Sequence, residues 1–241
     1  TGVDAAQIQL SEAVQKRGNH DLALSLHSET GIETFQTTEQ FDLIASVYGL
    51  EYSPLEQSLP LLKKLLAPNG QLTLLMHHAE SVITEMSVKA LTEFDFDQMK
   101  KIVTYINDIN DELNQSQGNL KALSKSPKAE AARESVNEFI SSLMNKSTAE
   151  RNPILVDFSQ NVLAFFKKVR QPEQQRRDFI DGILPDFHAS KERFTQMVNV
   201  ARNEKQIKTF KTQLTAAGFN NVKIDPINNE GVPVAWNVHA N

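Results

Sequence analysis

Side chains suited to acid–base chemistry follow two apolar runs of this sequence, residues 41–47 and residues 71–76. The four candidates are Tyr48, Glu51, His77 and His78. Both runs have the composition of buried parallel strands, and ligands bind beyond the carboxyl ends of such strands. An imidazole at that edge has a pKa suited to accepting a proton near neutral pH. We therefore predict that the catalytic groups lie among these four residues; the alternative is that one histidine packs its ring and the other is solvated.

The adjacent histidines do not indicate a metal centre. Neighbouring residues on a strand point to opposite faces of the sheet, so His77 and His78 would diverge from each other. The chain contains no cysteine, which excludes a disulfide framework, a thiolate zinc site and a cysteine nucleophile. We predict no bound metal.

Three regions of different texture must position these groups. The first, up to about Ile83, alternates strand-like and helix-like segments, and this order is typical of a parallel α/β sheet. Its predicted strands cover residues 1–4, 22–26, 41–47 and 71–76, and its predicted helices cover residues 7–14 and 59–66.

The second region repeats apolar residues at helical spacing and shows no strand-like alternation. Its predicted helices cover residues 99–113, 136–144 and 153–169, and two more begin at Pro172 and near Ser190, with a loop at 114–128. Asn152 followed by Pro153 is a typical helix start. We interpret this region as an all-helical insertion, and its place after the fourth predicted strand suggests a lid over the substrate.

The third region returns to α/β texture. A helix over residues 206–217 should end at Gly218, a residue that readily adopts the left-handed conformation. A strand starting at Val222, a turn at residues 228–231 and an alternating run at residues 234–238 then predict a final hairpin. The expected fold is a doubly wound, mostly parallel sheet with a C-terminal antiparallel strand and a large all-helical insertion. The predicted domains are residues 1–86, the insertion 87–203, and the return to the core at 204–241.

Several stretches in this order resemble the class I, Rossmann-like methyltransferases that use S-adenosylmethionine. They are Thr-Gly-Val-Asp at 1–4, Phe-Asp-Leu-Ile and Ser-Val-Tyr-Gly-Leu-Glu-Tyr within 41–52, the helix, turn and strand at 61–76, and Ala-Gly-Phe-Asn-Asn-Val at 217–222. Asn69 stands where the family usually has glycine, which is tolerable because asparagine also adopts positive φ. The resemblance covers the first and third regions but not the helical middle.

The resemblance implies S-adenosylmethionine as cofactor and assigns residues to it. Asp4, with Ala5 beside it, would accept hydrogen bonds from the ribose hydroxyls, and Glu29 would accept one from the adenine amino group. Ser46 and Tyr48 would border cofactor and substrate. Two alternatives remain: Asp4 could cap the following helix, and Glu29, where the family usually has aspartate, could be a surface residue.

The family's first strand and glycine-rich loop have no counterpart after Thr1, the first residue given. Such a strand lies in the middle of the sheet, and its removal would leave two ladders of backbone groups unpaired. We therefore expect the natural chain to continue N-terminal to residue 1.

Composition narrows the partners of this chain of 241 residues. Its net charge of −5 makes nucleic acid a poor partner. No apolar run is long enough to cross a bilayer and no secretory signal is visible, which together favour a cytoplasmic protein without a membrane partner. The resemblance implies a methyltransferase acting on a small or medium-sized acceptor. The alternatives are a non-catalytic interaction module on a Rossmann-like scaffold, and a nicotinamide-dependent oxidoreductase, since Asp4 would also suit a dinucleotide ribose.

Overall fold

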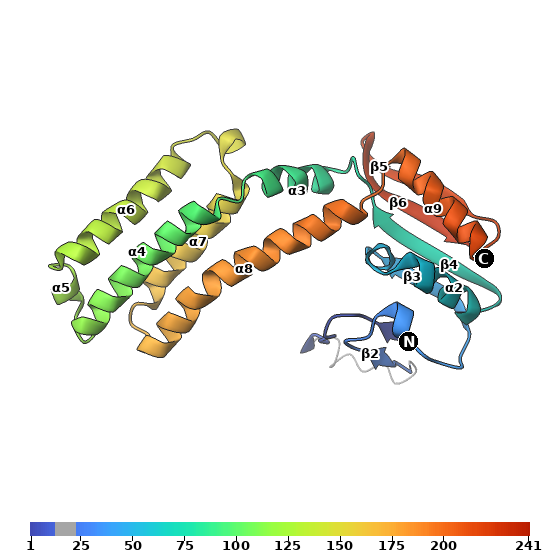
Figure 1. The fold of residues 1–241 in the computed structure, drawn as a ribbon, viewed down its shortest axis with the longest axis horizontal. Helices are drawn as coiled ribbons and strands as arrows, with labels where there is room; N and C mark the ends of the chain where they lie inside the picture. The colour runs from blue at the N-terminus through green and yellow to red at the C-terminus, as the bar shows by residue number, and fades with distance from the viewer. Residues whose placement is uncertain (13–22) are drawn as a thin grey trace. The chain divides into compact units, whose positions relative to one another are not determined.

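The computed structural model of the chain describes residues 1–12 and 23–241 and divides into two compact units (Figure 1). The first unit comprises Thr1–Glu85 and Asn199–Asn241, and the second comprises Met86–Val198. The predicted domain boundaries fell after residues 86 and 203. The predicted helix at 7–14 and the predicted strand at 22–26 lie partly outside the described residues. In their described parts, residues 7–11 are not helical and residues 23–25 are not in a strand, which begins only at Leu26.

The first unit contains two sheets. β1 (Gly2–Val3) pairs in parallel with β2 (Leu26–His27). The larger sheet has the order β3-β4-β6-β5, and its strands are β3 (Phe41–Val47), β4 (Leu66–His77), β5 (Lys223–Asn229) and β6 (Val232–Ala240). β3 and β4 are parallel, whereas β6 runs antiparallel to both of its neighbours.

The predicted doubly wound, mostly parallel sheet is wrong. The described residues form eight α-helices and two small sheets, and half of the four strand pairs are antiparallel. The C-terminal hairpin itself was expected, and its turn at Glu230 and Gly231, with φ of 51° and 83°, makes β5 and β6 antiparallel. The expected large parallel sheet is missing because β1 and β2 pair over two residues only, in a sheet separate from β3, with Leu24 and Leu26 left 52% and 37% exposed.

One face of the larger sheet forms the core of the first unit. Alternate residues of β4 and β6 point to this face, as the two-residue period of a strand requires. α2 (Leu55–Leu65) and α9 (Glu204–Ala216) cover it. The buried side chains include Leu59, Leu62, Leu72, Leu74, Met76, Phe210, Leu214, Trp236 and Val238. On the opposite face Leu43 and Val47 of β3 are 59% and 67% exposed.

The turn between α2 and the paired part of β4 depends on two residues. Asn69 adopts a φ of 69°, the left-handed conformation anticipated for an asparagine in this place. Gly70 is enclosed by backbone: a Cβ there would lie 2.8 Å from the Phe41 carbonyl oxygen and 2.9 Å from that of Ala67. Only glycine fits, and the turn therefore fixes the register of β4 beside β3.

The second unit consists of helices. The first of them, α3 (Val82–Thr92), begins in the first unit and continues into the second. The others are α4 (Phe96–Gln115), α5 (Leu120–Leu123), α6 (Pro127–Met144), α7 (Pro153–Lys168) and α8 (Glu173–Val200). The side chain of Asn152 accepts a hydrogen bond from the Leu155 amide at 3.0 Å, so the predicted cap of α7 is confirmed. No helix among the described residues is long and apolar enough to cross a membrane. The role of this unit as a lid stays a prediction.

Two expectations about the helices need correction. The predicted loop at 114–128 includes the short helix α5. The side chain of Asn119 caps the N-terminus of this helix. The helices predicted from Pro172 and near Ser190 form one continuous helix, α8, which contains Pro185. The hydroxyl of Ser190 donates to the Asp186 carbonyl one turn earlier at 2.9 Å, so this serine lies within the helix instead of capping a new one.

Phe158 lies at the centre of the core of the helical unit. It is fully buried and contacts the rings of Phe139 and Phe187, with centroids 5.9 Å and 5.5 Å away. We expect Phe158→Ala to lower the free energy of unfolding by about 3–5 kcal/mol, because it removes buried area and leaves a cavity. Urea denaturation of the whole chain followed by circular dichroism at the helical band would measure this. Leu163→Ala on the same helix, at a side chain 44% exposed, is the matched control and should cost far less.

Candidate functional site

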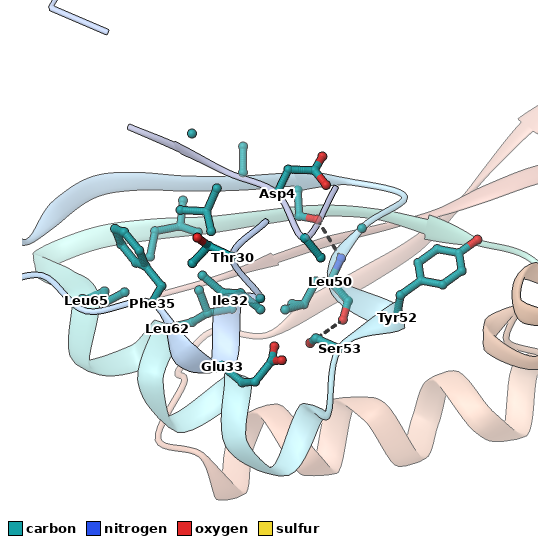
Figure 2. A pocket seen from close by; sticks show the side chains of 18 of the residues that line it. Asp4, Thr30, Ile32, Glu33, Phe35, Leu50, Tyr52, Ser53, Leu62 and Leu65 are labelled. Carbon is teal, nitrogen blue, oxygen red and sulfur yellow. Dashed lines mark hydrogen bonds between the residues drawn. The ribbon is translucent and has the colours of Figure 1, made fainter. Parts of the chain in front are cut away.

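A cavity of about 600 Å³ lies in the first unit beside β3 (Figure 2). Its walls come from the end of β1, from residues 30–35, from β3 with the loop that follows it, and from α2. In the view of Figure 2, Phe35 and Leu65 lie at one end and Tyr52 lies at the other. The cavity thus combines an apolar part with a part lined by hydroxyl and carboxylate groups.

The structure brings most of the predicted cofactor residues together. Asp4, Ala5, Ser46 and Tyr48 all line the cavity, although more than 40 residues separate the two pairs in sequence. Glu29 does not line it; this exposed residue has a φ of 53°, and its amide donates to the Ala6 carbonyl at 3.1 Å. Glu33, a carboxylate that the sequence analysis did not select, lines the cavity instead.

Asp4 is held by its backbone at the end of β1. Its amide donates to the His27 carbonyl at 3.1 Å, and its carbonyl accepts from the Thr30 amide at 2.9 Å. One carboxylate oxygen, Oδ1, accepts from the amide of Ala6 at 2.8 Å. This contact closes a local turn and does not cap a helix, because residues 5–11 are not helical. The side chain is nonetheless exposed and lines the cavity, which leaves the carboxylate accessible to a ligand.

The loop after β3 is tightly folded around Tyr48. Tyr48 has a φ of 52°, a conformation that bulky side chains rarely adopt and that costs about 1–3 kcal/mol. Its amide donates to the Leu75 carbonyl at 2.8 Å, which ties the loop to β4. The Leu50 amide donates to the Ser46 hydroxyl at 2.9 Å and starts the short 3-10 helix Leu50–Tyr52. The strained backbone of Tyr48 is thus imposed by its neighbours.

His77, at the end of β4, meets this loop through three contacts. Its ring stacks on that of Tyr48, with centroids 4.4 Å apart and planes 20° apart. Its Nε2 lies 3.1 Å from the hydroxyl of Tyr52. Its amide donates to Glu51 Oε1 at 3.1 Å. Burial lowers the pKa of His77, so the imidazole is favoured in its neutral form.

Glu51 is the buried carboxylate of the cluster, only 4% exposed. Its Oε2 is enclosed without a hydrogen-bond partner among the described residues. Burial raises the pKa of Glu51, although backbone hydrogen bonds and the nearby Arg202 guanidinium act in the opposite direction. The Glu51 charge in turn adds to burial in raising the pKa of Tyr48 and Tyr52.

His78 lies in a different environment from His77. It is 3% exposed, and its ring stacks on Trp236 with centroids 4.4 Å apart. Its Nδ1 accepts from the Glu80 amide at 3.0 Å, and the indole N–H of Trp236 donates to the Arg202 carbonyl at 2.7 Å. His78 therefore packs its ring in the core, which is what the alternative for the histidine pair described for one of the two residues. It does not line the cavity.

Two residues of this cluster were missed from the sequence. Tyr52 follows Glu51 directly. Its position in the loop after β3 could have indicated that it belongs to the site. Arg202 offered no signal, because it is more than 100 residues away from the other members. Its amide donates to the His77 carbonyl at 3.0 Å, and its guanidinium carbon lies 5.0 Å from the centroid of the Phe210 ring.

No protein-family model matches this chain, and no curated protein matches it in sequence. Within the described ranges, no group of three or more histidine, aspartate and glutamate side chains is arranged to hold a metal ion.

The buried Glu51 carboxyl should make stability depend on pH. The folded chain holds this proton more tightly than the unfolded chain, whose ordinary pKa is 4.5, so stability falls as pH rises through the folded pKa. The variant Glu51→Gln has no ionisable group at this position. We expect the unfolding free energy of the wild type minus that of the variant to decrease as pH rises above 4.5, the ordinary pKa of the group.

Trp236, the single tryptophan, is buried in the first unit, and its fluorescence during urea denaturation would report this difference. Glu56→Gln, at an exposed position of α2, is the matched control for replacing a glutamate by glutamine. A difference for Glu51→Gln that stays constant or grows with pH would contradict the prediction.

Proposed function

We propose that this protein is an S-adenosylmethionine-dependent methyltransferase acting on a small or medium-sized acceptor, and that the cavity beside β3 holds the cofactor. One observation carries the proposal. Asp4 and Ala5 come from one predicted strand end, and Ser46 and Tyr48 come from another, yet all four line a single cavity. The resemblance assigns these residues to one ligand.

The lining of the cavity suits a nucleoside. Its volume of about 600 Å³ lies within the range of about 300–1,000 Å³ common for small-molecule sites. The Asp4 carboxylate offers lone pairs to two adjacent ribose hydroxyls. Ile32, Phe35 and Leu62 provide apolar surface for a purine ring, and the nearby Glu33 carboxylate can accept from an exocyclic amino group. The resemblance implied Glu29 for the adenine contact, and we assign this contact to Glu33 instead.

The protein residues at the polar end have the task of positioning the acceptor. S-adenosylmethionine supplies an electrophilic methyl group on a sulfonium, so the protein contributes mainly proximity and orientation. Tyr48 and Tyr52 line the cavity and offer aromatic surface beside which an acceptor can lie. Asp4 and the tyrosines lie in the same cavity, which supports a shared site for the cofactor and the acceptor.

Removing the charge of Asp4 tests the proposal. We expect calorimetry of the whole chain to detect S-adenosylhomocysteine binding, and we expect Asp4→Asn to weaken it roughly tenfold or more, since hydrogen bonds to a charged group contribute about 1.5–3 kcal/mol. Asp42→Asn, an exposed carboxylate on β3 that does not line the cavity, is the matched control and should bind like the wild type.

The same titration separates the alternatives. Binding of NADH but not of S-adenosylhomocysteine would favour the oxidoreductase, and binding of neither would favour the interaction module. Equal affinity of Asp4→Asn and the wild type for S-adenosylhomocysteine would remove the assignment of the ribose contact.

A further inference from the structure

The cavity beside β3 is lined by charged side chains of one sign only. Asp4 and Glu33 line it, and no lysine, arginine or histidine side chain of the described residues does so. In the view of Figure 2, these two acidic residues lie above and below the apolar side chains of Ile32 and Leu62. A molecule bound against this apolar surface therefore lies close to two carboxylates and to no basic side chain of the lining.

Neither carboxylate is neutralised by an ion pair in the part of the chain that the structure describes. The salt bridges found there do not include Asp4 or Glu33. Two basic side chains of neighbouring segments interact elsewhere. The ammonium of Lys63 on α2 lies 5.4 Å from the centroid of a phenylalanine ring, and the guanidinium of Arg202 interacts with Glu51. The negative charge of the lining is therefore available to a ligand.

Gly31 leaves the space that the Glu33 carboxylate occupies. Its φ of −68° is one that any residue adopts, so this glycine is not required for its backbone conformation. A Cβ on Gly31 would lie 2.8 Å from Cδ of Glu33, which is too close for a real contact. Both residues line the cavity. The absence of a side chain at Gly31 thus lets the Glu33 carboxylate lie against the backbone of the cavity wall.

The charge of the lining distinguishes among the candidate ligands. Charges attract or repel more strongly in a cleft with apolar walls than in bulk water. S-adenosylmethionine carries a sulfonium and an ammonium against one carboxylate, hence one net positive charge, whereas S-adenosylhomocysteine has no net charge. Nucleotides carry negative phosphate groups. The two carboxylates therefore attract the cofactor more than its product, and they repel a nucleotide.

We propose, resting on the methyltransferase function above, that Asp4 and Glu33 make this cavity selective for positively charged ligands. It binds S-adenosylmethionine in preference to the uncharged product and disfavours ligands that bear phosphate. Glu33 is the residue that separates charge selectivity from hydrogen bonding. Its contact with the adenine amino group needs only an oxygen acceptor, which glutamine also offers, whereas attraction of the sulfonium needs the negative charge.

This selectivity assists release of the product. Methyl transfer breaks the bond between sulfur and the methyl carbon and leaves the electron pair of that bond on sulfur. An electron pair of the acceptor forms the new bond to carbon. Sulfur thereby loses its positive charge, and the attraction of Asp4 and Glu33 for the ligand weakens at the moment when the product must leave.

The first test compares the affinities of the two S-adenosyl compounds, measured by calorimetry of the whole chain at low salt. We expect the wild type to bind S-adenosylmethionine roughly threefold to tenfold more tightly than S-adenosylhomocysteine. Glu33→Gln should reduce this preference about twofold to fivefold and leave the affinity for S-adenosylhomocysteine nearly unchanged. Glu39→Gln removes the same charge at an exposed position that does not line the cavity, and this matched control should keep the wild-type preference.

The second test uses adenosine and adenosine 5′-monophosphate, which differ by the phosphate group. We expect the wild type to bind adenosine more tightly than the monophosphate, and we expect Glu33→Gln to narrow the difference. Added salt should narrow it too, because salt screens charges at accessible sites. The chain is acetylated at its N-terminus for both tests, because Thr1 also lines the cavity and a free amino group there adds a positive charge.

Equal affinity of the wild type for the two S-adenosyl compounds would overturn the charge selectivity. A preference that Glu33→Gln leaves unchanged, or a monophosphate that binds as tightly as adenosine, would overturn it as well. The failure of the proposed function has a different signature: neither S-adenosyl compound binds, whereas failure of the selectivity alone leaves both of them bound.

Discussion

The arrangement of the candidate site depends on one buried carboxylate. Glu51 sits in the loop after β3 and accepts a hydrogen bond from the amide of His77, at the end of β4. A buried charge is costly unless hydrogen bonds stabilise it, and here the stabilising donors belong to the backbone of the two segments that must meet. The parallel pairing of β3 with β4 brings Tyr48, Tyr52 and His77 together, and this carboxylate adds a hydrogen bond between the two strand ends. One of its oxygens lacks a partner among the described residues, which adds to the cost of this arrangement.

Local patterns in the sequence predicted what local physics decides. The helix cap at Asn152, the positive φ of Asn69 and the left-handed Gly218 each follow from the chemistry of one or two residues. The strand ends that carry Tyr48 and His77 were also found, because a short apolar run followed by polar residues is a strong signal. Tyr48, Glu51 and His77 of the candidate site could be predicted in this way.

Contacts between distant segments could not be predicted. Arg202 joins the cluster through the pairing of its backbone with the end of β4, and no local pattern marks such a bridge. Glu33 lines the cavity while Glu29 does not, a difference that depends on how the chain turns after β2. The extent of the sheet could not be predicted for the same reason: apolar runs indicate strands, but they do not show that β1 and β2 pair over only two residues and form a sheet of their own.

The backbone of Tyr48 bears on how this protein can change over generations. A φ of 52° strains the backbone of a tyrosine, whereas glycine or asparagine would adopt it with little strain. The stacking of its ring on His77 opposes that cost. The residue at this position therefore reflects a balance between backbone strain and the contacts of the tyrosine ring.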